Sequence, residues 1–157
     1  MKKILKKLNK VTISLIVVGV ILLLLLFDFV WAKTYQIEVA EIDPPNPVCS
    51  GMNADEISNV NITLQVTHFG KPVSGHKIIG YSLVNEASAG TFIENIVRTD
   101  EDGYAVFQYT VYAQAPFSPV SPVNMIFFDE DNSIVFEINA ELRFDLPVRQ
   151  REEGGTA

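Results

Sequence analysis

The stretch Asn59–Thr67, NVNITLQVT, decides the fold of most of this chain. Val60, Ile62, Leu64 and Val66 fall on one side of it, and Asn61, Thr63, Gln65 and Thr67 fall on the other. A strict period of two is typical of a half-buried strand in an antiparallel sheet, with one face on the core and one in solvent. The stretch therefore predicts a core-lining strand. Because the glycosylation sequon Asn61-Ile62-Thr63 lies inside this strand, we give it no weight.

Further segments with the same alternation predict additional strands on both sides of this one. They are residues 34–42, 77–84, 91–97, 105–111, 124–128 and 133–144. In the earliest segment Tyr35, Ile37, Val39 and Glu41 share a face. In residues 105–111 the expected inner face carries Ala105, Phe107, Tyr109 and Val111. For residues 77–84 the inner face is either Ile79, Tyr81 and Leu83 or their neighbours.

The last segment, residues 133–144, has the most regular alternation in the chain. Its apolar face consists of Ile134, Phe136, Ile138, Ala140, Leu142 and Phe144. We expect this segment to pair with residues 124–128 as a hairpin around Asp129–Asn132 and to line the core over its full length.

Turn and loop signals separate these segments. Residues 69–72 and 99–103 contain glycines, which supply the positive φ that a tight turn needs. Residues 48–58 and 85–90 have no strand period and are expected to be loops. Residues 115–123 carry prolines three apart, which is typical of a stiff polyproline-like connection.

An apolar run, Val11–Phe27, precedes all of these segments and contains no charge. Read as a helix through Trp31 it is about 30 Å long, which is enough to cross a bilayer core. Five lysines precede the run and acidic residues predominate after it. The positive-inside rule therefore places the N-terminus in the cytoplasm and the rest of the chain outside.

A secretory signal peptide is the alternative interpretation, since Val30 and Ala32 stand where a Val-x-Ala cleavage motif would need them. The length of the run favours a retained anchor, because the apolar core of a signal peptide is about 7–15 residues long. Trp31 also favours an anchor, because indole rings prefer the headgroup level. We expect Asp28, at the outer end of the span, to reach water.

The predicted fold class is all-β: an immunoglobulin-like antiparallel β-sandwich of seven to eight strands, preceded by one transmembrane α-helix. The expected organisation has four parts. They are a basic cytoplasmic segment (1–10), a signal anchor (11–31), the sandwich (32–146) and a disordered tail (147–157).

Two turn motifs resemble those of the bacterial immunoglobulin-like domains of invasin and intimin type. The first, G-x-P-V-x-G, is formed by Gly70, Pro72, Val73 and Gly75. The second, T-x-x-x-G-x-A, is formed by Thr99, Gly103 and Ala105. The resemblance covers roughly residues 55–112 and implies a surface-exposed sandwich that makes protein contacts. The proline-rich link and the long final hairpin depart from the family pattern.

The charge of the chain excludes some classes of partner. Beyond Ala32 there are seven Lys and Arg against eighteen Asp and Glu, which leaves a net charge of −11 on the outer part. Such a surface repels polyanions, so we expect no nucleic-acid partner. The five N-terminal lysines are suited to anionic lipid headgroups.

Candidate metal ligands are few, and their order along the sequence does not match that of a copper site. A cupredoxin-like copper site, with an electron-transfer role, would draw on His68, His76, Cys49, Met52 and Met125, but Cys49 precedes both histidines. We therefore expect His68 and His76 to be exposed strand-end residues.

Two other features, the acidic turns and the single cysteine, could either bind a ligand or partner or be ordinary structural residues. The acidic turns Asp100–Asp102 and Asp129–Asp131 could hold calcium, but acidic residues are also common turn formers. Cys49, the only cysteine, could pair with another subunit, although an unreactive loop thiol is the simpler interpretation.

No nucleophile elbow, phosphate loop or zinc-hydrolase motif is present, so we expect a non-enzyme without a cofactor. The predicted function is a membrane-anchored interaction or structural module, an accessory subunit of a membrane or cell-surface assembly. Its partner would be another membrane or surface protein, bound by strand addition at the first strand or the proline-rich link. A cell-surface adhesin is the alternative.

Overall fold

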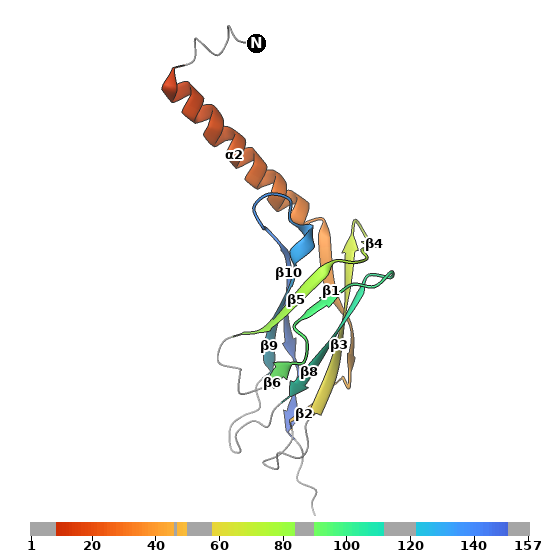
Figure 1. Cartoon of the computed structure of the whole chain (residues 1–157). Coiled ribbons are helices and arrows are strands. Elements are labelled where there is room, and N and C mark those ends of the chain that lie inside the picture. Colours follow the sequence, from red (N-terminus) through yellow and green to blue (C-terminus); the bar gives the residue numbers. More distant parts are fainter. Residues whose placement is uncertain (1–8, 46, 50–57, 84–89, 112–121, 151–157) are drawn as a thin grey trace, which may run out of the picture.

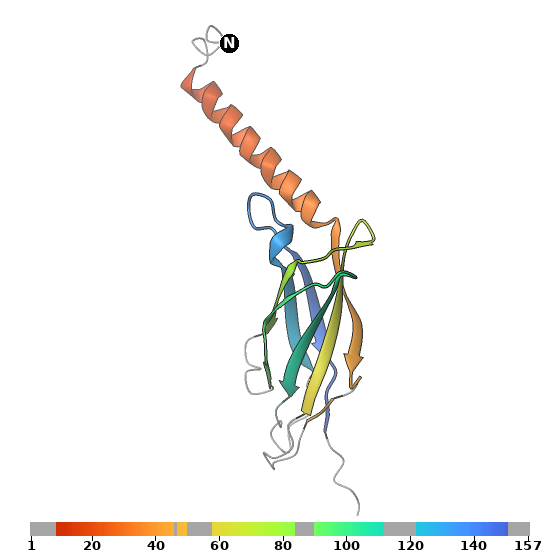
Figure 2. The same ribbon diagram turned by 45° about the vertical axis from the view of Figure 1, so that its right-hand side comes forward.

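One long helix leads directly into a β-sandwich in the computed structural model of the chain (Figure 1). The structure describes residues 9–45, 47–49, 58–83, 90–111 and 122–150. The helix projects from one end of the sandwich, and the strands run roughly along its long axis (Figure 2).

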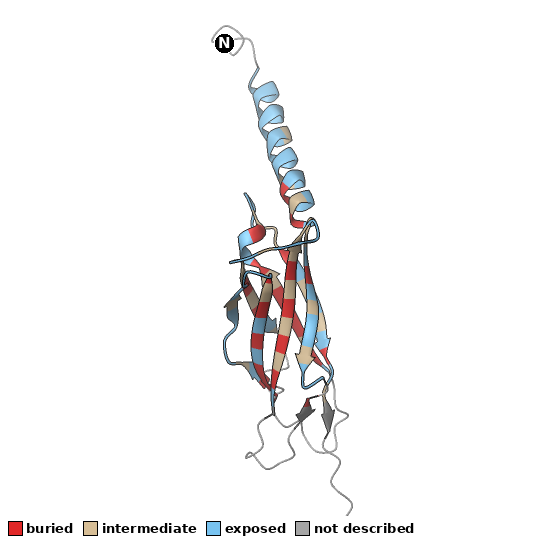
Figure 3. Cartoon of the chain, turned by 90° about the vertical axis from the view of Figure 1, so that its right-hand side faces the viewer, coloured by how far each residue is buried: buried red, intermediate tan, exposed pale blue. Residues whose placement is uncertain are grey.

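The helix α2 (Lys10–Ala32) contains 23 residues and is about 35 Å long at 1.5 Å per residue. Leucine, a good helix former, fills residues 22–26, and no proline interrupts the helix. Only 6% of its most apolar 18-residue stretch is buried in the fold, so almost all of its large side chains are exposed (Figure 3). The helix ends at Ala32 with Lys33 as its C-cap, and the Thr34 hydroxyl then donates to the Trp31 carbonyl over 2.6 Å. The predicted span of 11–31 is confirmed as a helix.

Two antiparallel sheets form the sandwich, and their strand orders are β1-β3-β8-β6 and β10-β9-β5-β7. The first sheet contains β1 (Tyr35–Asp43), β3 (Ser58–His68), β6 (Gly90–Phe92) and β8 (Tyr104–Val111), with the short β4 (Lys71–Pro72) added to β3. The second contains β5 (Lys77–Ser82), β7 (Ile96–Arg98), β9 (Val123–Asp129) and β10 (Ala140–Leu146). Far from the helix, β2 (Val48–Cys49) pairs in parallel with β11 (Arg149–Gln150).

The core lies between the two sheets and is built by alternate residues of the central strands. From the first sheet it takes Val60, Ile62, Leu64, Val66, Ala105, Phe107, Tyr109 and Val111, and from the second Ile78, Val123, Met125, Phe127 and Leu146. The Phe92 ring lies edge-on to Tyr109, Phe107 and Phe127, with centroids 4.9, 5.8 and 5.9 Å away. The predicted fold class, an all-β sandwich preceded by one helix, is confirmed. In the described residues, eight strands have three or more residues and three have only two.

The prediction for the inner face of the first strand is wrong at its far end. The pairing of β1 with β3 shifts between Val39 and Glu41, so that Ile42 lies opposite Ile62 and packs against the core. A bulge of this kind moves every following side chain to the other face of the strand. As a result Glu41 is exposed to solvent.

In β5 the inward-facing residues are Ile78 and Gly80, the second of the two sets that the sequence allowed. A Cβ at Gly80 would lie 2.9 Å from the Phe127 ring. The missing side chain therefore lets the two neighbouring strands pack, and Tyr81 faces solvent.

Residues 91–97 were predicted as one strand, but the chain changes sheets there. Phe92 ends β6 in the first sheet and Ile96 begins β7 in the second, and both Ile93 and Ile96 are exposed. The turn at residues 99–103 consequently joins the two sheets and is not a hairpin within one of them.

The prediction of a continuous strand over residues 133–144 is also wrong. Only Ala140–Leu146 forms a strand, β10, while the short 3₁₀ helix η1 (Glu130–Asn132) and a loop over 133–139 replace the first half. Two other expectations change at the end far from the helix, because Val48–Cys49 and Arg149–Gln150 pair as strands where a loop and a disordered tail were expected. Met52, most of the proline-rich link and the last seven residues lie outside the described residues.

Replacing Gly103 by alanine is expected to destabilise the protein more than replacing Gly70. Both glycines have left-handed φ values, +77° and +73°, so each substitution costs about 1 kcal/mol of backbone strain. A Cβ at Gly103 would also lie 2.7 Å from the Val66 carbonyl oxygen, whereas a Cβ at Gly70 meets nothing within 4 Å. The overlap adds roughly 1–3 kcal/mol.

The measurement is thermal unfolding of the two full-length variants in a mild detergent, followed by near-UV circular dichroism. Gly70→Ala is the matched control for the φ effect alone. Equal melting temperatures for the two variants would contradict the packing assigned to this turn.

Candidate functional site

The end of α2 is joined to the sandwich by the carboxylate of Asp28. Asp28 Oδ1 accepts a hydrogen bond from the backbone N–H of Ile134 at 3.0 Å, and Oδ2 accepts from Val135 at 3.1 Å and Phe136 at 2.6 Å. Successive N–H groups of this kind form an anion-binding nest, and bonds to a carboxylate are stronger than bonds between neutral groups. Asp28 is only 1% exposed. The expectation that it reaches water is therefore wrong.

The partner of Asp28 is the loop formed by residues 133–139, which we call the 133–139 loop. Asn132 Oδ1 accepts from the N–H of Ala140 at 3.2 Å and so closes the base of the loop. At its far side Glu137 has a φ of +53°, a conformation rare for residues with a Cβ, which turns the chain back toward β10. The loop thus has a fixed base and a tip bound to the helix.

A cluster of rings forms a second contact between α2 and the first sheet. The His68 ring stacks on Tyr35 with centroids 4.1 Å apart, and it lies 5.0 Å from Trp31 and 4.5 Å from Phe69. The His76 ring also stacks with Tyr35, with centroids 5.5 Å apart. Offset and edge-on ring pairs of this kind each contribute about 0.5–1.5 kcal/mol beyond their burial. The expectation that both histidines are simply exposed is wrong, because both are half-buried.

His76 also joins the start of β5 to the end of β9, two neighbouring strands of the second sheet, through Asp129. Its Nδ1 lies 2.7 Å from Asp129 Oδ2, and Asp129 Oδ1 accepts from the N–H of Asp131 at 3.1 Å. Asp129 is fully buried. Burial raises the pKa of its carboxyl group above the ordinary value, and the hydrogen bond and charge of His76 oppose that rise.

Exposed charged side chains also join η1 to the start of β5 near this bond. Asp131 Oδ2 accepts from the Lys77 N–H at 2.9 Å and lies 3.3 Å from the Arg98 guanidinium, which also donates to the Gly75 carbonyl at 2.6 Å. The Lys77 ammonium group pairs with Glu130. Exposed pairs of this kind contribute little stability individually, so their main effect is to fix η1 against β5.

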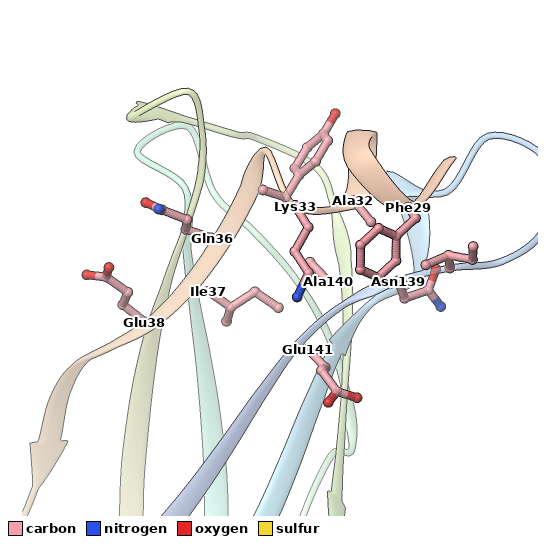
Figure 4. A pocket seen from close by; sticks show the side chains of 11 residues that line it. Phe29, Ala32, Lys33, Gln36, Ile37, Glu38, Asn139, Ala140 and Glu141 are labelled. Atoms are coloured by element: carbon pink, nitrogen blue, oxygen red, sulfur yellow. The ribbon is translucent and has the colours of Figure 1, made fainter. Parts of the chain in front are cut away.

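A groove of about 480 Å³ opens beside the helix end, between the edge strands β1 and β10 (Figure 4). Phe29 and Lys33 extend into it from the chain above, and Ile37 points into it from β1. The Gln36 and Glu38 side chains point away, toward solvent (Figure 4). The Lys33 ammonium group lies 5.5 Å from the centre of the Phe29 ring. The groove is therefore lined both by apolar side chains and by polar ones, among them Lys33, Asn139 and Glu141.

The two edge strands that border the groove are strongly acidic. Their exposed charged residues are Glu38, Glu41, Asp43, Glu141, Arg143 and Asp145. Arg143 is the only cation among them, and its Nε already lies 3.5 Å from Glu141. Each strand has a single neighbour in its own sheet, so its outer backbone edge is unpaired within the sheet.

The structure disperses the residues that sequence reasoning considered for metal binding. Met125 is fully buried in the core, Cys49 lies in β2, and His76 bonds to Asp129. The Asp100 carboxylate accepts from the N–H groups of Asp102 and Tyr104 at 3.0 and 2.8 Å, as an ordinary turn residue does. Within the described ranges, no three His, Cys, Asp or Glu side chains are grouped so that they could hold a metal ion.

Sequence reasoning missed the role of Asp28. A lone carboxylate at the end of an apolar run is a signal in itself, because such a group needs a partner. Its partner, however, is a set of backbone groups 106–108 residues further along the chain, and backbone groups carry no sequence signature.

Three comparisons with known proteins were made. No protein-family model matches the chain. No curated protein matches it either. Among solved structures, it is similar to a conjugative transposon lipoprotein from Bacteroides eggerthii. The similarity covers 72% of this chain and 96% of that chain, at 20% sequence identity and a TM-score of 0.41.

Substituting Asp28 by alanine is expected to free the 133–139 loop. The variant loses three charge-assisted bonds to backbone N–H groups, so the local opening free energy should fall by about 2 kcal/mol or more, and amide exchange in the loop should quicken by roughly tenfold or more. Hydrogen-exchange mass spectrometry of the full chain in detergent measures this. Asp145→Ala, which removes an exposed carboxylate from β10, is the control. Unchanged exchange in the Asp28 variant would contradict the assigned bonds.

The stability difference between the wild type and Asp129→Asn is expected to depend on pH. Because the folded-state pKa of Asp129 is raised, its contribution is fully present below the unfolded value near 3.8 and is lost as pH rises through the folded value. The stability of the wild type relative to Asp129→Asn should therefore fall over the window from pH 3.8 up through the raised folded-state value.

Denaturation of both proteins across that window measures the difference. A relative stability that instead rises with pH would show that the bond to His76 outweighs the burial of the carboxyl group.

Proposed function

We propose that the chain is a single-pass membrane protein whose sandwich contacts another membrane or surface protein, as an accessory subunit of a larger assembly. In this proposal α2 is a retained anchor, the N-terminus lies in the cytoplasm and the sandwich lies outside. The sandwich acts through contact and performs no catalysis.

The observation that carries the proposal is the way the helix end is built into the sandwich. Cleavage after Ala32 would remove the Asp28 carboxylate and leave the loop N–H groups without their acceptor. It would also remove the Trp31 ring from the cluster around His68. A signal peptide leaves no such gap in the mature fold, so these contacts favour a retained anchor.

The exposed surface of α2 supports the same conclusion. Contiguous apolar patches larger than a few hundred Å² are rare on soluble monomers. Here a 23-residue helix exposes nearly all of its apolar side chains, and a bilayer would cover them. The five lysines before it and the acidic sandwich after it favour the cytoplasmic placement of the N-terminus.

The edge of β1 is the best candidate for partner binding. It is unpaired within its sheet, it lies next to the membrane end of the sandwich, and Glu38, Glu41 and Asp43 line it. An added strand would gain backbone hydrogen bonds there, and complementary charge would favour a partner segment rich in Lys or Arg. The bulge after Val39 divides this edge into a part nearest the helix, which carries Glu38, and a far part, which carries Glu41 and Asp43.

The proposal also assigns the sandwich to the immunoglobulin-like domains of invasin and intimin type. The motif glycines Gly70, Gly75 and Gly103 all have left-handed φ values, between +73° and +78°, as the tight turns of that motif require. This agreement supports a contact-making surface module.

Site-specific photocrosslinking in membranes of cells that naturally produce the chain tests the proposal. A photoreactive residue at Glu38 should yield a defined adduct with one membrane or surface protein, identified by mass spectrometry. The same residue at Val106, which is exposed on β8 away from the edge, is the matched control. Identical patterns at both positions, or a mature chain that begins at Lys33, would overturn the proposal.

A further inference from the structure

The 133–139 loop carries three consecutive apolar side chains that the sandwich does not cover. Ile134, Val135 and Phe136 are 53%, 48% and 38% exposed. Isolated exposed apolar residues are common on protein surfaces, but three in succession at the tip of one loop form a patch. The remainder of the loop does not explain them, because its fixed base needs only Asn132 and Ala140.

The position of this patch is set by its bonds to the helix. Its three N–H groups bind Asp28, which is the residue directly after the apolar run that ends at Phe27. The loop therefore rises past the end of the sandwich to the level of the last turns of α2, as Figures 1 and 2 show. Phe27, Phe29 and Val30 on the helix are also exposed at that level. The patch thus continues the apolar surface of the proposed span.

Backbone N–H groups at the tip of the loop already have hydrogen-bond acceptors within the protein. In hydrocarbon an unsatisfied N–H group costs several kcal/mol, which normally excludes irregular loops from the membrane. Here the N–H groups of the same three residues that expose apolar side chains are satisfied by one buried carboxylate. The side chains can therefore leave water without the loss of the hydrogen bonds made by those three N–H groups.

From these observations we infer that the tip of the 133–139 loop inserts into the outer leaflet of the bilayer beside α2, as a second membrane contact. The inference rests on the proposed function, since it requires α2 to be a span. The occupant of the patch is lipid at the boundary of headgroups and acyl chains, where Ile, Val and Phe side chains are stabilised. Two contacts fix the tilt of the sandwich, and with it the direction in which the β1 edge faces.

The test uses the full chain with Cys49 replaced by serine and one new cysteine, at Val135 or at Ile93, labelled with an environment-sensitive fluorophore. Ile93 is the matched control, an apolar side chain 55% exposed that follows β6. Both proteins are reconstituted into phosphatidylcholine–phosphatidylglycerol vesicles. Shallow spin-labelled lipids should quench the probe at position 135 about threefold more than the probe at 93, and aqueous iodide should quench it about threefold less.

Adding Asp28→Ala to the Val135 protein should raise iodide quenching at 135 about twofold, because the freed N–H groups then seek water. Asp145→Ala should leave it unchanged. Quenching at 135 by iodide as strong as at 93, in vesicles that retain the chain through alkaline extraction, would overturn the inference alone. Protection of position 135 from both quenchers would mean that protein covers the patch, which also overturns it. Release of the chain by alkaline extraction would overturn the anchor as well.

Discussion

The carboxylate of Asp28 binds three consecutive backbone N–H groups, and the position of the helix relative to the sandwich depends on this contact. A buried carboxylate with one weak partner would be unfavourable, because its desolvation would not be offset. With three donors it is satisfied, and the donors are satisfied in return. The ring cluster around His68 then joins the helix to the opposite sheet. Together these contacts hold the helix to both layers of the sandwich.

This arrangement separates the molecule into regions with different tasks. The core of the sandwich is apolar and made by alternate residues of long strands, so it supplies stability without a disulfide. The end next to the helix contains three buried polar residues, Asp28, Asp129 and Asn132, each with a specific hydrogen-bond partner. Buried polar contacts are strongly directional, so they determine orientation more than they determine stability. The acidic edge strands β1 and β10 run from this end of the sandwich, so the same contacts determine their direction relative to the helix.

Pattern reasoning succeeded for the central strands because both partners of each contact obey the same period. The inner residues of β3 and β8, from Val60 to Val66 and from Ala105 to Val111, face inward as predicted. It failed where one local event changed the period. The bulge after Val39 exchanged Glu41 for Ile42, and Gly80 let β5 present its other face. It failed for residues 91–97 because a short apolar segment does not indicate which of two sheets it joins.

The loop at residues 133–139 shows the same limit most clearly. Its alternation equals that of a strand, yet three of its N–H groups, those of residues 134–136, are bound to a carboxylate more than a hundred residues earlier. Those three groups are therefore not available to a neighbouring strand. Sequence alone determined the long apolar helix, the all-β class and the central strands, because periodicity and length are local properties. The tertiary structure decided the role of Asp28, the burial of His68 and His76 and the place of the apolar loop tip. Those features depend on backbone groups and rings that meet only after the chain has folded.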